Sequence, residues 1–143
     1  MAITLHADLE QDGPSTSKAT VRSHTVFVDR PAAKGGADRG PLGGEYLLVA
    51  LGGCFSSHLL AAIRAREAPV TGVRVAVDGT LDGSPERFTA FEVSVDATCS
   101  DRDLLEKLVA IAERACQVIA TLRQSTPVAV TVRSSAATGA GAR

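Results

Sequence analysis

The chain has 143 residues, of which 45% are hydrophobic, so it is long enough to bury the core of one domain. Aromatic residues make up only 3% and Trp is absent, which argues against a surface that stacks nucleic-acid bases. The formal net charge of -1 likewise argues against a basic patch for phosphates. We therefore expect a single domain over residues 1–133 that does not bind nucleic acid.

The N-terminal part has the pattern of a β-hairpin. Apolar residues alternate with polar ones over residues 3–9, and residues 11–17 are dense in turn formers. β-branched residues are frequent over residues 19–29, which predicts a second strand that returns antiparallel to the first. Five glycines and two prolines over residues 30–44 then predict a loop. It is either a flexible connector or a functional loop that delivers Arg30 and Arg39 to a site.

The longest apolar run, residues 43–66, predicts a buried helix that carries a cysteine. Its apolar stripe recurs at spacings of three and four and includes Leu47, Leu48, Leu51, Cys54, Phe55, His58, Leu59, Ala62 and Ile63. Glu45 interrupts the run and Arg64 closes it, so we expect a core helix and no membrane span. Gly52 and Gly53 are costly inside a helix, which indicates that another backbone or a ligand comes close there.

The second half of the chain predicts a hairpin, a helix and a last strand. Alternating apolar residues indicate strands over residues 73–81 and 88–98, and helical spacing continues from a cap at Ser100 or Asp101 to about Leu122. A short strand follows over residues 128–132, and residues 134–143 are predicted to be a disordered tail. The order β-β-α-β-β-α-β predicts an α+β fold in which two long cysteine-bearing helices pack on antiparallel sheets.

The three cysteines are the candidate reactive groups. No secretory signal is visible, so we expect a cytoplasmic protein with reduced thiols. Cys54 alone could be an inert apolar residue, but Cys116 lies on a comparable helical face, which favours a reactive pair. We expect Cys99 to be a surface or edge thiol. His58, one turn after Cys54, is either a base or, more commonly, a hydrogen-bonded residue at the rim.

Metal and cofactor sites are not expected. The sequence contains no Cys-x-x-Cys or His-x-x-x-His pair, and its histidines are scattered singly.

Two segments resemble the OsmC/Ohr family of osmotically inducible and organic hydroperoxide resistance proteins. The first is Glu45-Tyr-Leu-Leu-Val-Ala-Leu-Gly-Gly-Cys54, with an acidic residue nine positions before a small-small-Cys step. The second is Ala112-Glu-Arg-Ala-Cys-Gln-Val-Ile-Ala-Thr-Leu-Arg123, with a cysteine in a helix followed by Thr-Leu-Arg. The Gly-Pro-Leu-Gly-Gly stretch at residues 40–44 also looks like the family's Gly-Pro-Ser-Pro lead-in, and the strand order agrees over residues 3–133.

This resemblance implies an intertwined homodimer whose two active sites lie at the subunit interface. Cys54 would be the peroxidatic thiol and Cys116 the resolving one, with an arginine and a glutamate activating Cys54. The organic hydroperoxide would be reduced to an alcohol and water, and a dithiol such as a lipoyl protein would restore the pair. We expect a thiol-dependent peroxidase without a bound cofactor, acting as an antioxidant in a stress response.

Two positions depart from the family pattern. The catalytic glutamate of its best-characterised peroxidases falls at Gly44 here, while Glu45 matches a more broadly shared acidic residue. The arginine could be Arg30 or Arg39, and Glu45 would orient it, since a carboxylate repels a thiolate. The alternative function is a non-catalytic dimer of the same fold that binds a small apolar ligand at the subunit interface.

Overall fold

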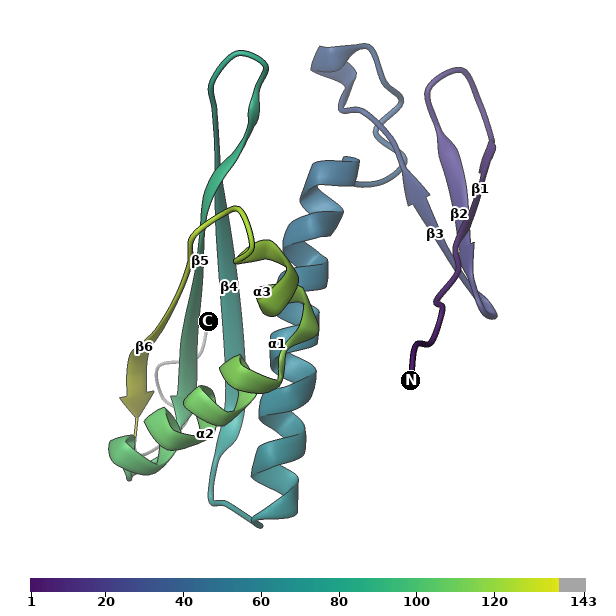
Figure 1. The fold of residues 1–143 in the computed structure, drawn as a ribbon. Coiled ribbons are helices and arrows are strands. Elements are labelled where there is room, and N and C mark those ends of the chain that lie inside the picture. The colour runs from purple at the N-terminus through teal and green to yellow at the C-terminus, as the bar shows by residue number, and fades with distance from the viewer. Residues whose placement is uncertain (137–143) are drawn as a thin grey trace. The chain divides into compact units, whose positions relative to one another are not determined.

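The computed structural model describes residues 1–136, which form two compact units, residues 1–47 and the chain from Leu48 onward (Figure 1). The predicted disordered tail began at residue 134, but residues 134–136 belong to the last strand. The rest of that prediction, residues 137–143, lies outside the described residues.

The N-terminal unit contains a three-stranded antiparallel sheet in the order β1-β2-β3. Its strands are β1 (Asp8–Gln11), β2 (Ser17–Val21) and β3 (His24–Val28), and a short 3-10 helix η1 (Ala32–Lys34) follows. The single strand predicted over residues 19–29 is wrong, because Arg22 has a φ of 55° and the chain reverses there. The first strand begins at Asp8 rather than at residue 3.

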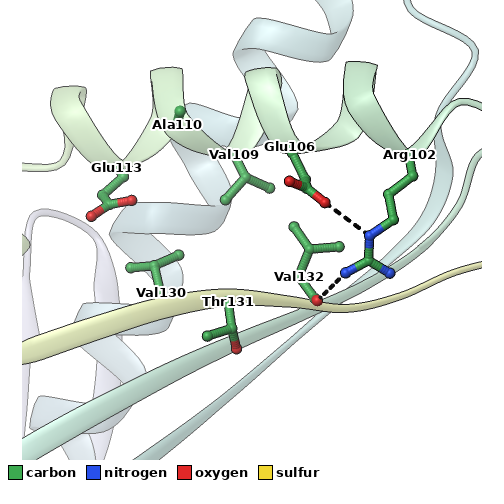
Figure 2. Close-up of a pocket in the computed structure, with 8 residues that line it drawn as sticks. All are labelled: Arg102, Glu106, Val109, Ala110, Glu113, Val130, Thr131 and Val132. Carbon is green, nitrogen blue, oxygen red and sulfur yellow. Dashed lines mark hydrogen bonds and ion pairs between the residues drawn. The ribbon is translucent and has the colours of Figure 1, made fainter.

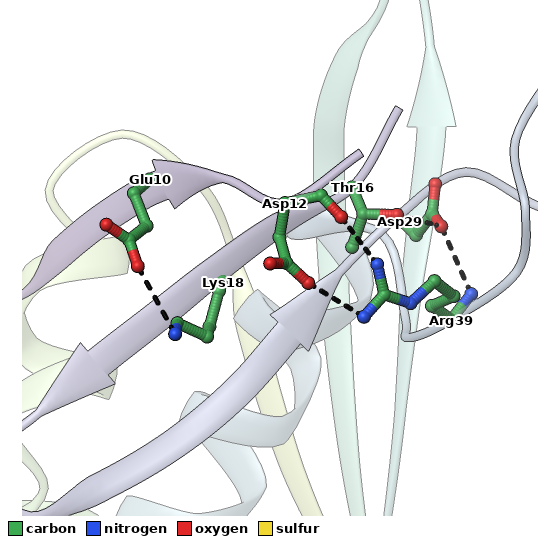
Figure 3. A network of polar contacts seen from close by, with 6 residues as sticks. All are labelled: Glu10, Asp12, Thr16, Lys18, Asp29 and Arg39. Carbon is green, nitrogen blue, oxygen red and sulfur yellow. Dashed lines mark hydrogen bonds and ion pairs between the residues drawn. The ribbon is translucent and has the colours of Figure 1, made fainter. Parts of the chain in front are cut away.

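A buried carboxylate holds the loop of this unit to its sheet (Figure 3). Asp29 is 3% exposed and accepts hydrogen bonds from the Thr16 hydroxyl at 2.8 Å, the Arg30 N–H at 2.7 Å and the Arg39 N–H at 3.2 Å. Burial opposes ionisation of this carboxyl, but the hydrogen bonds outweigh it and hold the pKa of Asp29 well below its usual range. Asp29 therefore ties β3 and the following loop to the β1-β2 turn.

The C-terminal unit combines a second three-stranded sheet with helices on one of its faces (Figure 1). Its elements are α1 (Gly43–Ala65), which begins in the N-terminal unit, β4 (Thr71–Asp82), β5 (Arg87–Thr98), α2 (Arg102–Ala115), α3 (Gln117–Leu122) and β6 (Val128–Ala136). β4 pairs antiparallel with β5, whereas β6 pairs parallel with it. The prediction of purely antiparallel sheets is corrected here, because the helical connection between β5 and β6 returns the chain in the same direction.

Apolar side chains from the helices and from one face of the sheet form the core. The fully buried ones include Leu51, Phe55, Leu59, Val93, Val95, Leu105, Leu108 and Ile119. α1 is long and apolar enough to cross a membrane by length and composition. The burial of Leu51, Phe55 and Leu59 on successive turns from the middle of the helix onward favours a core helix instead.

The second helix is interrupted at its cysteine. Asp101 caps α2 as predicted, accepting from the Leu104 N–H at 3.0 Å. The continuous helix predicted to about Leu122 is wrong, because Cys116 has an extended backbone with ψ of 113°. The Cys116 sulfur accepts a hydrogen bond from the Ile119 N–H at 3.5 Å, so Cys116 is the N-cap of α3. Cys116 thus lies between α2 and α3 rather than inside a helix.

The free edge of β6 is covered by arginine side chains. Arg102 donates to the Val132 carbonyl at 2.6 Å, and Arg123 donates to the Val128 carbonyl at 2.7 Å. Between α2 and β6 lies a surface groove of about 360 Å³ whose lining includes Arg102, Val109 and Val132 (Figure 2). Because these two arginines occupy two backbone carbonyls of β6, they hinder another strand from pairing with this edge. Neither Cys54 nor Cys116 lines the groove.

Gly52 and Gly53 provide a matched pair of tests for the α1–β4 contact. A Cβ added at Gly52 would lie 2.9 Å from Val77 Cγ2, whereas one added at Gly53 meets nothing within 4 Å. We expect Gly53→Ala to raise the free energy of unfolding by about 0.5–1 kcal/mol through helix propensity. Gly52→Ala should be about 1–3 kcal/mol less stable than Gly53→Ala, because it overpacks Val77. Urea denaturation measures both, and equal stabilities would contradict the close contact.

The low pKa of Asp29 predicts a pH-dependent stability. Folding favours the ionised carboxylate, so its stabilisation is complete above the unfolded-state pKa of about 3.9 and is lost as the pH falls toward the lower folded-state pKa. We expect Asp29→Asn to have a lower free energy of unfolding than the wild type at neutral pH. The difference between the two proteins should become smaller below about pH 4. Urea denaturation from neutral to acid pH checks this, and a constant difference would contradict it.

Candidate active site

Cys54 is the more accessible of two neighbouring thiols. It lies on α1 between the buried Leu51 and Phe55 and is itself half-buried. His58 follows it by four residues, so both side chains lie on the same side of the helix, one turn apart. The local reason for this placement is the apolar stripe, which turns Leu51 and Phe55 inward and leaves Cys54 at its border.

Cys116 is the buried member of the pair. It is 1% exposed, and its thiol is a near neighbour of the Cys54 thiol. Burial raises the pKa of the Cys116 thiol, and the neighbouring Cys54 raises it further, while the Ile119 N–H opposes the shift. Cys116 is therefore held as a neutral thiol in contact with a more accessible one.

Gln117 joins the site although sequence reasoning did not identify it. Its Oε1 accepts a hydrogen bond from the Cys54 thiol at 3.3 Å and lies 2.9 Å from His58 Nε2. His58 thus has the hydrogen-bond partner that was expected, while its alternative role as a base stays a prediction. The only sequence signal for Gln117 is its position directly after Cys116, and its role depends on the interruption between α2 and α3.

The three predicted activating residues belong to the N-terminal unit. Glu45 Oε1 accepts from the Leu42 N–H at 2.8 Å at the start of α1. Arg39 forms an ion pair with Asp12 at 2.8 Å, and the Arg30 N–H donates to Asp29. Each contact also has a purely structural meaning, so a catalytic role for Glu45, Arg30 or Arg39 stays a prediction.

Cys99 lies apart from this pair. The prediction that Cys99 is a surface or edge thiol is wrong, because its side chain is buried with 2% exposure. The thiol donates a hydrogen bond to the Asp101 carbonyl at 3.2 Å. It follows β5 directly, where the start of α2 and the end of β6 cover it.

The described residues contain no group of three or more His, Cys, Asp or Glu side chains able to hold a metal ion. The arrangement at Cys54 is suited to dithiol–disulfide chemistry, since an accessible thiol can react first and a buried thiol in contact with it can condense with the product.

Known proteins share this sequence pattern and this fold. A family model described as OsmC-like protein matches residues 35–131. An OsmC-like protein from Mycoplasma pneumoniae is 14% identical, with a TM-score of 0.82 over 94% of this chain and 99% of that one. An organic hydroperoxide resistance protein OsmC from Legionella pneumophila is 18% identical, with a TM-score of 0.71 over 92% and 98%. The organic hydroperoxide resistance protein OhrB of Bacillus subtilis is 17% identical, with a TM-score of 0.68 over 92% and 98%.

The comparison with curated protein sequences gave no match. The solved structures confirm the predicted α+β OsmC-like fold. The matched residues 35–131 make up more than half of the 143-residue chain and include both Cys54 and Cys116, and the protein therefore belongs to the OsmC-like family.

Proposed function

We propose that the protein is a thiol-dependent peroxidase that reduces organic hydroperoxides. The observation that carries this proposal is that the half-exposed Cys54 thiol lies beside the buried Cys116 thiol, so a peroxide can reach Cys54 first and Cys116 can condense with the product. Family membership and the organic hydroperoxide resistance proteins among the similar structures support a peroxide-related role.

The proposed reaction has two steps on the protein. The Cys54 thiolate attacks the terminal oxygen of the hydroperoxide, the O–O bond breaks, and the leaving alkoxide takes up a proton to become the alcohol. Cys54 is thereby oxidised to a sulfenic acid. The Cys116 thiol then condenses with it, forming the Cys54–Cys116 disulfide and releasing water. A dithiol, such as a lipoyl protein, reduces the disulfide by thiol–disulfide exchange and is itself oxidised to a disulfide.

Activation of Cys54 requires a group that favours the thiolate. A guanidinium close to a thiol does so, and we propose Arg30 or Arg39 for this task. Glu45 would orient the arginine through a bidentate pair. Arg39 already pairs with Asp12 within its unit, so we place Arg30 first.

Peroxide consumption by the two cysteines can be tested by counting thiols. Reduced protein mixed with one equivalent of cumene hydroperoxide should lose two of its three thiols, and peptide mapping should find Cys54 joined to Cys116 with Cys99 still reduced. Cys54→Ser should abolish peroxide consumption, whereas Cys99→Ser is the matched control and should retain it. Three remaining thiols in the wild type would overturn the proposal and favour a non-catalytic protein that binds an apolar ligand.

We further propose that the working unit is a homodimer in the cytoplasm. Apolar side chains remain exposed on both units, among them Leu9 at 60%, Val49 at 61% and Leu60 at 48%. A second copy of the chain would cover these residues, and an obligate dimer of this kind buries more than about 2,000 Å² in total.

Light scattering at decreasing protein concentration under reducing conditions tests the dimer. We expect twice the chain mass down to nanomolar concentrations, because the proposed apolar interface of more than about 2,000 Å² would be obligate. Leu60→Glu, which places a charge on an exposed apolar position of α1, should lower the mass, whereas Glu67→Lys beyond the helix end should not. A folded monomer that keeps its thiol reactivity would contradict the proposal.

A further inference from the structure

The side-chain amide of Gln117 connects the reactive thiol to the imidazole. Cys54 and His58 come from one side of α1, and Gln117 is the first residue of α3. The amide oxygen accepts the Cys54 thiol hydrogen at 3.3 Å and lies 2.9 Å from His58 Nε2. All three residues belong to the C-terminal unit, so this geometry is set within one compact part of the chain.

This orientation of the amide fits the protonated thiol only. An amide oxygen accepts hydrogen bonds and cannot donate them, so Cys54 must carry its hydrogen and His58 must carry one on Nε2. When Cys54 loses its proton to water, the sulfur becomes an acceptor and carries a negative charge. The amide oxygen would then face the thiolate without a hydrogen between them, which is unfavourable.

A half-turn of the amide resolves this conflict. The NH₂ end has nearly the shape of the oxygen end and carries two hydrogens, one for the thiolate and one for His58. His58 accepts the second hydrogen when its own proton lies on Nδ1 and Nε2 presents a lone pair. Gln117 is exposed, so its side chain has room to turn. The Gln117 amide can therefore pair with Cys54 and His58 in both states. Its oxygen accepts from the two groups when both are donors, and its NH₂ group donates to them when both are acceptors.

We propose that Gln117 is a positioning residue that turns its amide over and donates a hydrogen bond to the Cys54 thiolate, with His58 holding the turned amide through Nε2. The inference rests on the proposed function, because it takes Cys54 as the attacking thiol. It adds a group in the C-terminal unit that donates a hydrogen bond to the thiolate, in addition to the arginine proposed from the N-terminal unit. It also gives His58 an orienting task in place of direct proton transfer with Cys54.

The replacement Gln117→Glu tests whether residue 117 acts on Cys54 as a hydrogen-bond donor or only as an acceptor. A glutamate keeps the length and the acceptor oxygens of the resting state, but an ionised carboxylate has no hydrogen to donate to the thiolate. We expect the alkylation rate of Cys54 by iodoacetamide at neutral pH to fall by roughly tenfold to a hundredfold, the range for one hydrogen bond to a charged group. The ultraviolet absorbance of the thiolate, with the Cys54→Ser protein as the blank, should fall in parallel.

Two further variants guard against a trivial charge or folding effect. Gln117→Met is uncharged and of similar length, and it should lower the alkylation rate in the same direction. Gln124→Glu makes the same charge change at an exposed position in the turn after α3 and should leave the rate within about threefold of the wild type. Circular dichroism shows whether each variant is folded.

The outcomes distinguish this inference from the proposed function. Alkylation needs no peroxide, so a slow Gln117→Glu variant supports the inference even where the wild type consumes no hydroperoxide. A Gln117→Glu or Gln117→Met variant that alkylates within threefold of the wild type overturns it. His58→Phe should slow alkylation less than Gln117→Glu does, since the amide keeps its hydrogens; an equal or larger loss would assign the decisive role to the imidazole and overturn the inference.

Discussion

The structure of the candidate site depends on the contact between the thiols of Cys54 and Cys116. That contact needs the extended backbone at Cys116, because the interruption lets its side chain turn toward Ile119 and Cys54 instead of continuing the apolar face of α2. The same interruption starts α3 at Gln117 and brings its amide to Cys54. Burial then makes the two cysteines unequal, so that one thiol is accessible and the other is kept neutral.

Much of the fold could be predicted from the sequence where one pattern dominated. The apolar stripe of α1 is present, and another element, β4, does come close at Gly52, whereas a Cβ at Gly53 would have no such neighbour. The parallel pairing of β6 was missed, since strand periodicity carries no direction. The β2–β3 turn was missed because Arg22 takes a positive φ without the glycine that usually marks such a turn.

The candidate site was predicted in part. Cys54 and Cys116 follow from helical spacing and from the family motif, and the structure brings them together. The helical spacing continues past Cys116 without Gly or Pro, so nothing in the sequence marks the interruption that positions Gln117. Asp29 was also missed, because its donors come from separate parts of the chain, the Thr16 hydroxyl from the β1–β2 turn and the Arg30 and Arg39 N–H groups from the loop after β3.

The central claim is that Cys54 reacts with the peroxide and Cys116 resolves the product, and trapping of the sulfenic acid tests it most directly. Treatment with an organic hydroperoxide in the presence of dimedone should label Cys54 in the Cys116→Ser variant and leave it nearly unlabelled in the wild type, where the buried thiol condenses first. Equal labelling of Cys54 in both proteins, or no labelling in either, would contradict the account.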